Sequence, residues 1–146
     1  MAGRAMVRSG LFTDGATPAL LGSRCLVCGA HHFPQQDTCP YCAAEGPSPV
    51  ELSRRGSLWA WTAVTAAPPG YQGEIPFGLG IVELPEGIRI ITRLSASDPG
   101  ALSPGQPMEL EIVALHVDAE GNDVMTYSFA PTPAAPPAPA GAPPAP

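Results

Sequence analysis

The stretch CLVCGAHHFPQQDTCPYC, from Cys25 to Cys42, contains all four cysteines of the 146-residue chain. They form two C-x-x-C pairs, and ten residues separate the pairs. Zinc prefers four tetrahedral ligands, and thiols spaced in this way can point into one small coordination sphere. Both pairs lie among turn-forming residues, namely Gly29 and Pro40. The spacing therefore predicts a zinc ribbon whose ligands are Cys25, Cys28, Cys39 and Cys42.

Other chemistries also use paired cysteines. A disulfide framework suits small secreted proteins, but Arg4 and Arg8 are followed by no apolar stretch of the kind that a secretory signal needs. A thioredoxin-like redox site needs one C-x-x-C on a βαβ unit, whereas this chain has two pairs among turn residues. Iron stays open as the alternative metal, because CLVCG and CPYC resemble rubredoxin knuckles and a tetrahedral sulfur site accepts either ion.

A four-cysteine metal site is closed and leaves no position for water or substrate. We therefore expect the four thiolates to stabilise a ribbon that is too small to fold on its own core, and not to catalyse. His31 and His32 lie in the same loop. Since four cysteines already fill the coordination shell, we expect both histidines to be exposed.

The charge of the chain argues against one large class of partners. The formal net charge is −6, and all seven basic residues are arginine. Nucleic-acid binding rests on neutralising phosphates, so an acidic chain without a basic stripe predicts no nucleic-acid partner. The chain also has no run of about 18 apolar residues, which predicts no membrane span. We expect a cytoplasmic protein with no membrane partner.

Composition divides the chain into segments. The end, APTPAAPPAPAGAPPAP, has too few apolar side chains to offset the entropy lost on ordering, so we expect a disordered tail. The predicted order is an N-terminal extension at 1–16, a zinc ribbon at 17–48, a barrel at 49–130 and a Pro/Ala-rich tail at 131–146.

After Gly56 the sequence becomes a series of short β-rich runs separated by turn residues. Five strands are predicted, at 57–66, 77–84, 88–94, 108–117 and 124–130. Alternation in the third strand places on one face Ile88, Ile90, Thr92 and Leu94, and on the other Arg89, Ile91 and Arg93. Because five such strands leave unprotected edges unless they close, we expect a mainly β protein with a five-stranded OB-fold barrel; an SH3-like barrel is the alternative.

Two segments together resemble a known family: GSRCLVCGAHHFPQQDTCPYC and GSLWAWTAVTAAPPGYQGEIPFGLGIVELPEGIRIITRL. This is the bacterial and archaeal family of zinc-ribbon/OB-fold proteins long catalogued as a domain of unknown function. The resemblance covers about 10–130. It rests on the four cysteines, the aromatic first strand, the Pro-Pro-Gly-Tyr loop and the hairpin VEL-x-EG-x-R.

The resemblance implies a function. Members of this family typically accompany thiolase-fold enzymes, as non-catalytic subunits of acyl-CoA thiolases, of aldolases that shorten steroid side chains and of related acyltransferases. The small subunit helps to enclose the CoA part of the substrate and stabilises its partner. By resemblance we expect a thiolase-fold partner in a hetero-oligomer, zinc as cofactor and acyl-CoA as shared ligand. Lipid or steroid degradation is the favoured setting.

The residues themselves offer no catalytic site. The chain has no G-x-S-x-G elbow, no cysteine beyond the metal set and no evident carboxylate pair. His116 stands alone near the end of a predicted strand, where a histidine is more often structural than a general base. We expect no catalytic activity from this chain alone.

Six residues are candidates for contact with CoA or with the partner. Tyr71 and Phe77 belong to a proline-stiffened loop, and such loops bind at low entropic cost, or simply cover the end of a barrel. Arg89 and Arg93 suit phosphate oxygens, or offset nearby glutamates. We expect Trp59 and Trp61 on one side of the first strand. That side faces either the core or an interface.

Two other functions compete with the accessory-subunit interpretation. Zinc ribbons and OB barrels also serve single-stranded nucleic-acid binding, which the acidic charge disfavours. A rubredoxin-like electron carrier would contain iron and would be red.

Overall fold

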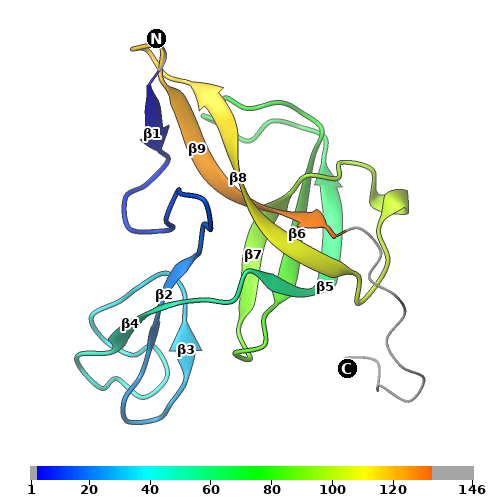
Figure 1. The fold of residues 1–146 in the computed structure, drawn as a ribbon. Helices are drawn as coiled ribbons and strands as arrows, with labels where there is room; N and C mark the ends of the chain where they lie inside the picture. The colour runs from blue at the N-terminus through cyan, green and yellow to red at the C-terminus, as the bar shows by residue number, and fades with distance from the viewer. Residues whose placement is uncertain (1–2, 133–146) are drawn as a thin grey trace.

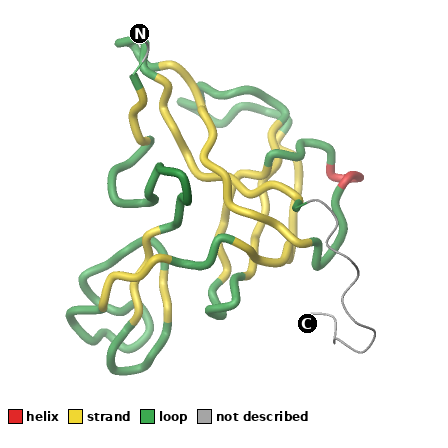
Figure 2. The backbone as a smooth tube through the Cα atoms, in the orientation of Figure 1, coloured by secondary structure: helices red, strands yellow, loops and turns green. Residues whose placement is uncertain are grey.

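The computed structural model describes residues 3–132, in which a small ribbon lies beside a larger barrel (Figure 1). The ribbon sheet consists of β2 (Leu21–Arg24), β3 (His31–His32) and β4 (Ser48–Glu51). The other strands are β1 (Arg4–Met6), β5 (Arg55–Val64), β6 (Phe77–Glu83), β7 (Arg89–Leu94), β8 (Pro107–Val117) and β9 (Asp123–Pro131). The one helical element within 3–132 is the short 3-10 turn η1 (Pro99–Ala101) (Figure 2), and no helix in that range could span a membrane.

Strands β5 to β9 close into a five-stranded barrel. The hydrogen-bonded order is β9-β7-β6-β5-β8, and β8 returns to pair with β9. Neighbouring strands are antiparallel except β7 and β9, which run parallel with Leu94 opposite Phe129. This order is that of an OB fold and confirms the predicted architecture. Closure removes most of the free edges that an open sheet would expose.

Alternation along the strands explains why the barrel surrounds an apolar core. In β7, Ile90, Thr92 and Leu94 are buried while the residues between them point outward, as the pattern predicts. Met108 and Leu110 of β8 are buried in the same way. Successive side chains of a strand face opposite sides of a sheet, so one face of each strand fills the barrel interior.

The ribbon and the barrel share this core. Leu20 and Leu52 from the ribbon side lie in one cluster of buried side chains with Leu58 and Val82 of the barrel. The Phe33 and Tyr127 rings also meet edge-to-face across the two modules, with centroids 5.5 Å apart. The backbone N–H of Ser53 donates to Oε2 of Glu86 at 2.7 Å, which ties the linker between the modules to the β6–β7 turn. The two modules therefore form one packed unit.

The structure contains a strand that the sequence pattern did not predict, namely β1. It runs parallel to β9 with Ala5 opposite Val124, and the backbone N–H of Val7 donates to the carbonyl of Met125 at 2.8 Å. Three residues are too few to show alternation, so nothing in the local pattern identifies them as a strand. This pairing uses a part of β9 that β7 does not reach, since β7 pairs with β9 only at Ser128 and Phe129.

The start of the predicted tail differs from the expectation. Pro131 is the last residue of β9 rather than part of a tail, and Thr132 donates from its backbone N–H to the carbonyl of Pro107 at 3.1 Å. The remainder of the predicted disordered tail, 133–146, lies outside the described residues.

Gly78 of β6 provides a test of this packing. A Cβ at that position would overlap the carbonyl oxygen of Ala96 and lie 2.9 Å from Cβ of Leu94. Because the obstacles are backbone and a buried side chain, Gly78→Ala should lower the free energy of unfolding by about 1–3 kcal/mol, measured by urea denaturation. Gly15→Ala is the control, since its Cβ would meet nothing within 4 Å. An unchanged midpoint for Gly78→Ala would contradict the close packing.

Candidate functional site

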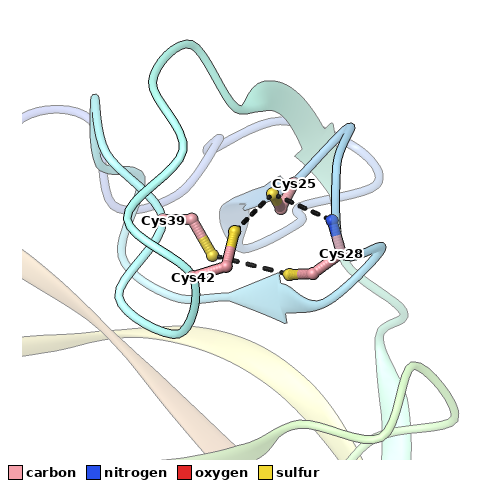
Figure 3. Close-up of side chains that lie close together, drawn as sticks. All are labelled: Cys25, Cys28, Cys39 and Cys42. Carbon is pink, nitrogen blue, oxygen red and sulfur yellow. Dashed lines mark hydrogen bonds between the residues drawn. The ribbon is translucent and has the colours of Figure 1, made fainter.

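The four cysteines lie on two loops that face each other (Figure 3). Their Sγ atoms all lie within 4.8 Å of one another. The Cys25 and Cys42 sulfurs are 3.5 Å apart, and those of Cys28 and Cys39 are 3.7 Å apart. Sulfurs bound tetrahedrally to one zinc ion at about 2.3 Å would be separated by about 3.8 Å. The four residues therefore fit a single tetrahedral metal ion.

Each pair of cysteines is held by the same backbone turn. Gly29 N–H donates to the carbonyl of Cys25, and Ala43 N–H donates to the carbonyl of Cys39, both at 3.0 Å. The turn-closing residues have positive φ, 76° at Gly29 and 65° at Ala43. Glycine adopts this conformation freely, whereas alanine does so at a cost that the surrounding structure must offset.

Backbone N–H groups inside these turns point at two of the sulfurs. Val27 and Cys28 donate to Sγ of Cys25, and Tyr41 donates to Sγ of Cys39, each at 3.4 Å. Such donors stabilise thiolates and orient metal ligands. The donors are backbone N–H groups two or three residues after the first cysteine of each pair, so the contacts depend on the C-x-x-C turn and not on the side chains between the cysteines.

The thiols differ in acidity because of these contacts. The N–H groups of Cys28 and Val27 lower the pKa of Cys25 to about 6. Burial opposes the change at Cys39, but the N–H groups of Cys42 and Tyr41 still lower its pKa. At Cys42 the N–H of Ala44 opposes the shift, yet the contact with Cys25 and burial raise the pKa to about 11. A cation beside Cys42 would oppose this rise in its pKa and favour the thiolate.

The expectation that both histidines are exposed is wrong. His31 is half-buried and His32 is only 2% exposed. The two residues form β3, in which His32 lies opposite Ser23 of β2, so strand alternation turns its ring inward. Nδ1 of His32 lies 3.5 Å from the carbonyl oxygen of Pro34. Within 3–132, the group of possible metal ligands consists of the four cysteines without either histidine.

The barrel brings three of the other candidates together at one end of β7. The rings of Tyr71 and Phe77 have centroids 4.9 Å apart, and the guanidinium of Arg93 lies 4.7 Å from the Phe77 centroid. Nη1 of Arg93 donates to the hydroxyl oxygen of Tyr71 at 2.8 Å, and that hydroxyl donates to the carbonyl of Glu74. In the part of the chain that the structure describes, no carboxylate forms an ion pair with Arg93.

Arg89 is held differently at the other end of β7. Its Nε lies 3.0 Å from Oε2 of Glu83, and its guanidinium lies 4.1 Å above the ring of Trp59. A carboxylate therefore neutralises Arg89, and an aromatic ring covers it.

The expectation that Trp59 and Trp61 share one side of the strand is wrong. The register between β5 and β6 shifts between Leu58 and Ala60, so Trp59 occupies a β-bulge. Trp59 is 47% exposed, whereas Trp61 packs against the core and donates its indole N–H to the carbonyl of Pro99 at 2.9 Å. Nothing in the run SLWAWTAVTA marks the bulge.

The structure also shows a surface that sequence reasoning missed, which we call the outer wall. Register aligns three rows of outward side chains across β5, β6 and β7: Thr62–Leu79–Arg93, Ala60–Ile81–Ile91 and Ser57–Glu83–Arg89. Leu79 and Ile81 are outward while Val82 is buried, so β6 is apolar on both faces. A nearly continuous apolar run, such as FGLGIVEL, is the signal that could have revealed a strand with apolar side chains on both of its faces.

Replacing one ligand tests the metal centre. In Cys25→Ser the thiolate is lost, and a serine oxygen is a poor ligand for a metal that prefers sulfur. We expect metal content measured by plasma mass spectrometry to fall, together with amide hydrogen-exchange protection in β2 and β3. His31→Gln is the control and should retain both. A Cys25→Ser protein with full metal content and protection would contradict the four-sulfur site.

Two family models match the chain in succession. Residues 12–48 match the rubredoxin-like zinc ribbon domain of ChsH2, and residues 49–113 match the C-terminal OB-fold domain of ChsH2. The two matches meet at the start of β4, and together they cover most of the described ribbon and barrel.

Individual relatives agree with the family models. The chain is 33% identical to the benzoylsuccinyl-CoA thiolase subunit BbsA of Thauera aromatica over 116 residues, which are 80% of this chain and 78% of that protein. It is 31% identical to a DUF35 domain-containing scaffold protein of Methanocaldococcus jannaschii over 112 residues, 75% of this chain and 78% of the relative.

A solved structure shows the same fold. The chain superposes on the structure titled Ltp2-ChsH2(DUF35) aldolase with a TM-score of 0.61 and 26% sequence identity, covering 77% of this chain and 84% of that chain. The sulfur geometry, the closed barrel and these matches lead to one conclusion: the chain belongs to the DUF35 family of ChsH2-type proteins, which combine a rubredoxin-like zinc ribbon with a C-terminal OB fold.

Proposed function

We propose that this chain is a non-catalytic accessory subunit of a thiolase-fold enzyme and that it helps to bind the CoA part of an acyl-CoA substrate. The observation that carries the proposal is the alignment of both modules with subunits of such assemblies. BbsA is a thiolase subunit, and the matching solved structure is an aldolase that contains a ChsH2 chain. The alignment with BbsA extends over about four fifths of both proteins, so the shared part is the ribbon and the barrel together.

The electrostatics of the barrel support an anionic contact at one position. Arg89 is paired with Glu83, but Arg93 has no carboxylate partner among residues 3–132. The guanidinium of Arg93 is nevertheless fixed by the Tyr71 hydroxyl and the Phe77 ring. An ordered arginine without a counterion is suited to a phosphate of CoA or to a carboxylate of a partner protein.

The metal proposed for the sulfur cluster is zinc. The four thiolates hold the ribbon loops together through the ion, and the closed coordination shell has no position for a substrate. The chain purified from its native cells should be colourless and contain zinc. A red protein with iron in the cluster would instead favour the electron-carrier alternative, and absorbance with elemental analysis distinguishes the two.

The central experiment is affinity purification of the tagged full-length chain from its native cells, with mass spectrometry of the proteins that elute with it. We expect a thiolase-fold protein in near-stoichiometric amount, and the complex should bind acyl-CoA more tightly than the isolated chain does. The control is the Cys25→Ser variant, in which loss of the ribbon should remove the partner as well.

A different result would contradict the proposal. If the chain elutes alone at low salt with its metal bound, it is not an accessory subunit of this kind. Binding of single-stranded DNA in the absence of salt would then be measured, because that is the function which the fold otherwise serves.

A further inference from the structure

The outer wall has an apolar centre that faces solvent. Ile91 lies in the middle of β7 and is 67% exposed, and it stands opposite Ile81 of β6. Trp59, 47% exposed, projects from the bulge in β5 on the same side as Arg89. Large exposed apolar side chains that are scattered singly need no explanation, but here they are neighbours on one surface.

The apolar centre of the outer wall is not flat, and its hollows could receive side chains of another protein. Two shallow hollows lie on either side of Ile91, and both include Leu79 and Ile91. The first hollow extends across β5 to Trp61, and the second extends to Leu115 of β8 and Tyr127 of β9. Leu79 and Ile91 thus form a low ridge between two depressions. Interfaces between proteins are packed by side chains that interdigitate in this way.

The charge of the outer wall indicates that a partner surface should carry a negative charge. Within its three rows the Glu83–Arg89 pair is neutral, and Arg93 carries the one unbalanced charge. The chain as a whole has a net charge of −6, so the outer wall, with its net positive charge, is opposite in sign to the chain. Arg93 is half-buried and fixed in place, which lowers the entropy that a partner must remove on binding.

We propose that the outer wall is the surface on which the thiolase-fold partner docks, with apolar side chains of the partner in the two hollows beside Ile91 and a partner carboxylate against Arg93. This inference rests on the proposed function and assigns the surface that performs it. The wall has the anatomy of an interface, because its centre is apolar and an arginine lies at each end, Arg89 against the Trp59 ring and Arg93 against the Phe77 ring.

A protein surface fits the wall better than CoA does. Phosphate sites commonly use helix N-termini or clusters of free backbone N–H groups. The backbone of β6 is instead paired on both sides, with β5 and with β7, along the centre of the wall. Arg93 is also the one cation available in the three rows. An apolar surface with shallow relief and one unpaired positive charge matches an apolar protein patch with one carboxylate.

The test measures the affinity between the full chain and the thiolase-fold subunit that co-purifies with it, by biolayer interferometry. Ile91→Glu should weaken binding by about 30-fold or more, as expected for loss of a central interface residue. Arg93→Glu should weaken it about 10- to 100-fold, because it opposes like charges across the interface.

Matched controls separate the outer wall from the rest of the surface. Val117→Glu places the same charge on a 60% exposed apolar residue at the end of β8 that lines neither hollow. Arg8→Glu reverses the charge of an exposed arginine outside the wall. Both should bind within about threefold of the wild-type chain. Metal content and circular dichroism are measured for Ile91→Glu to check that it is folded, which we expect because the outward position of this residue in β7 leaves the core intact.

A photo-crosslinking amino acid at position 91, with position 117 as its control, gives a second measurement that does not depend on the folding of the glutamate variant. Crosslinks to the partner are expected from position 91 only. If no thiolase-fold subunit binds the wild-type chain, both the proposed function and the proposed docking surface are wrong. If the partner binds the wild type and both wall variants equally, or if Ile91→Glu weakens acyl-CoA binding alone, only the docking surface is overturned.

Discussion

The gathering of four cysteine sulfurs within 4.8 Å of one another, as a metal site requires, is the constraint on which the rest of this structure depends. The ribbon strands are short, and β3 has only two residues, so backbone pairing and apolar burial cannot hold the ribbon without help. A metal ion held by the four sulfurs would fix the two loops and so keep β2 and β4 in register. That register in turn places Leu20 and Leu52 in the core that the ribbon shares with the barrel.

The shared core makes the barrel a rigid platform for the surface opposite it. Outward residues alternate with buried ones, so their positions are set by how tightly the strands pack inside. Leu79 and Ile81, for example, are outward because Gly78, Gly80 and Val82 are buried in β6. The arginines at the two ends of β7 are likewise held by neighbouring rings. A surface built in this way is ordered before any partner binds.

Sequence reasoning succeeded where strong local chemistry decides the structure. The C-x-x-C spacing predicted the sulfur cluster, and period-two alternation predicted which residues of β7 are buried. It failed where the outcome depends on contacts distant in sequence. The inward turn of His32 follows from pairing with Ser23, and the separation of Trp59 from Trp61 follows from a bulge in the β5–β6 register. Neither has a local signal, because each is a property of two strands and not of one.

The strand β1 has a consequence for how the molecule behaves in a crowded solution. It pairs with β9 over Arg4–Met6, next to backbone groups of β9 that β7 does not reach. An uncovered strand edge is a template on which an extended segment of another protein can add. The chain thus supplies its own strand for this edge. By covering β9 where β7 does not pair with it, β1 leaves fewer free backbone groups on which a strand of another protein could add.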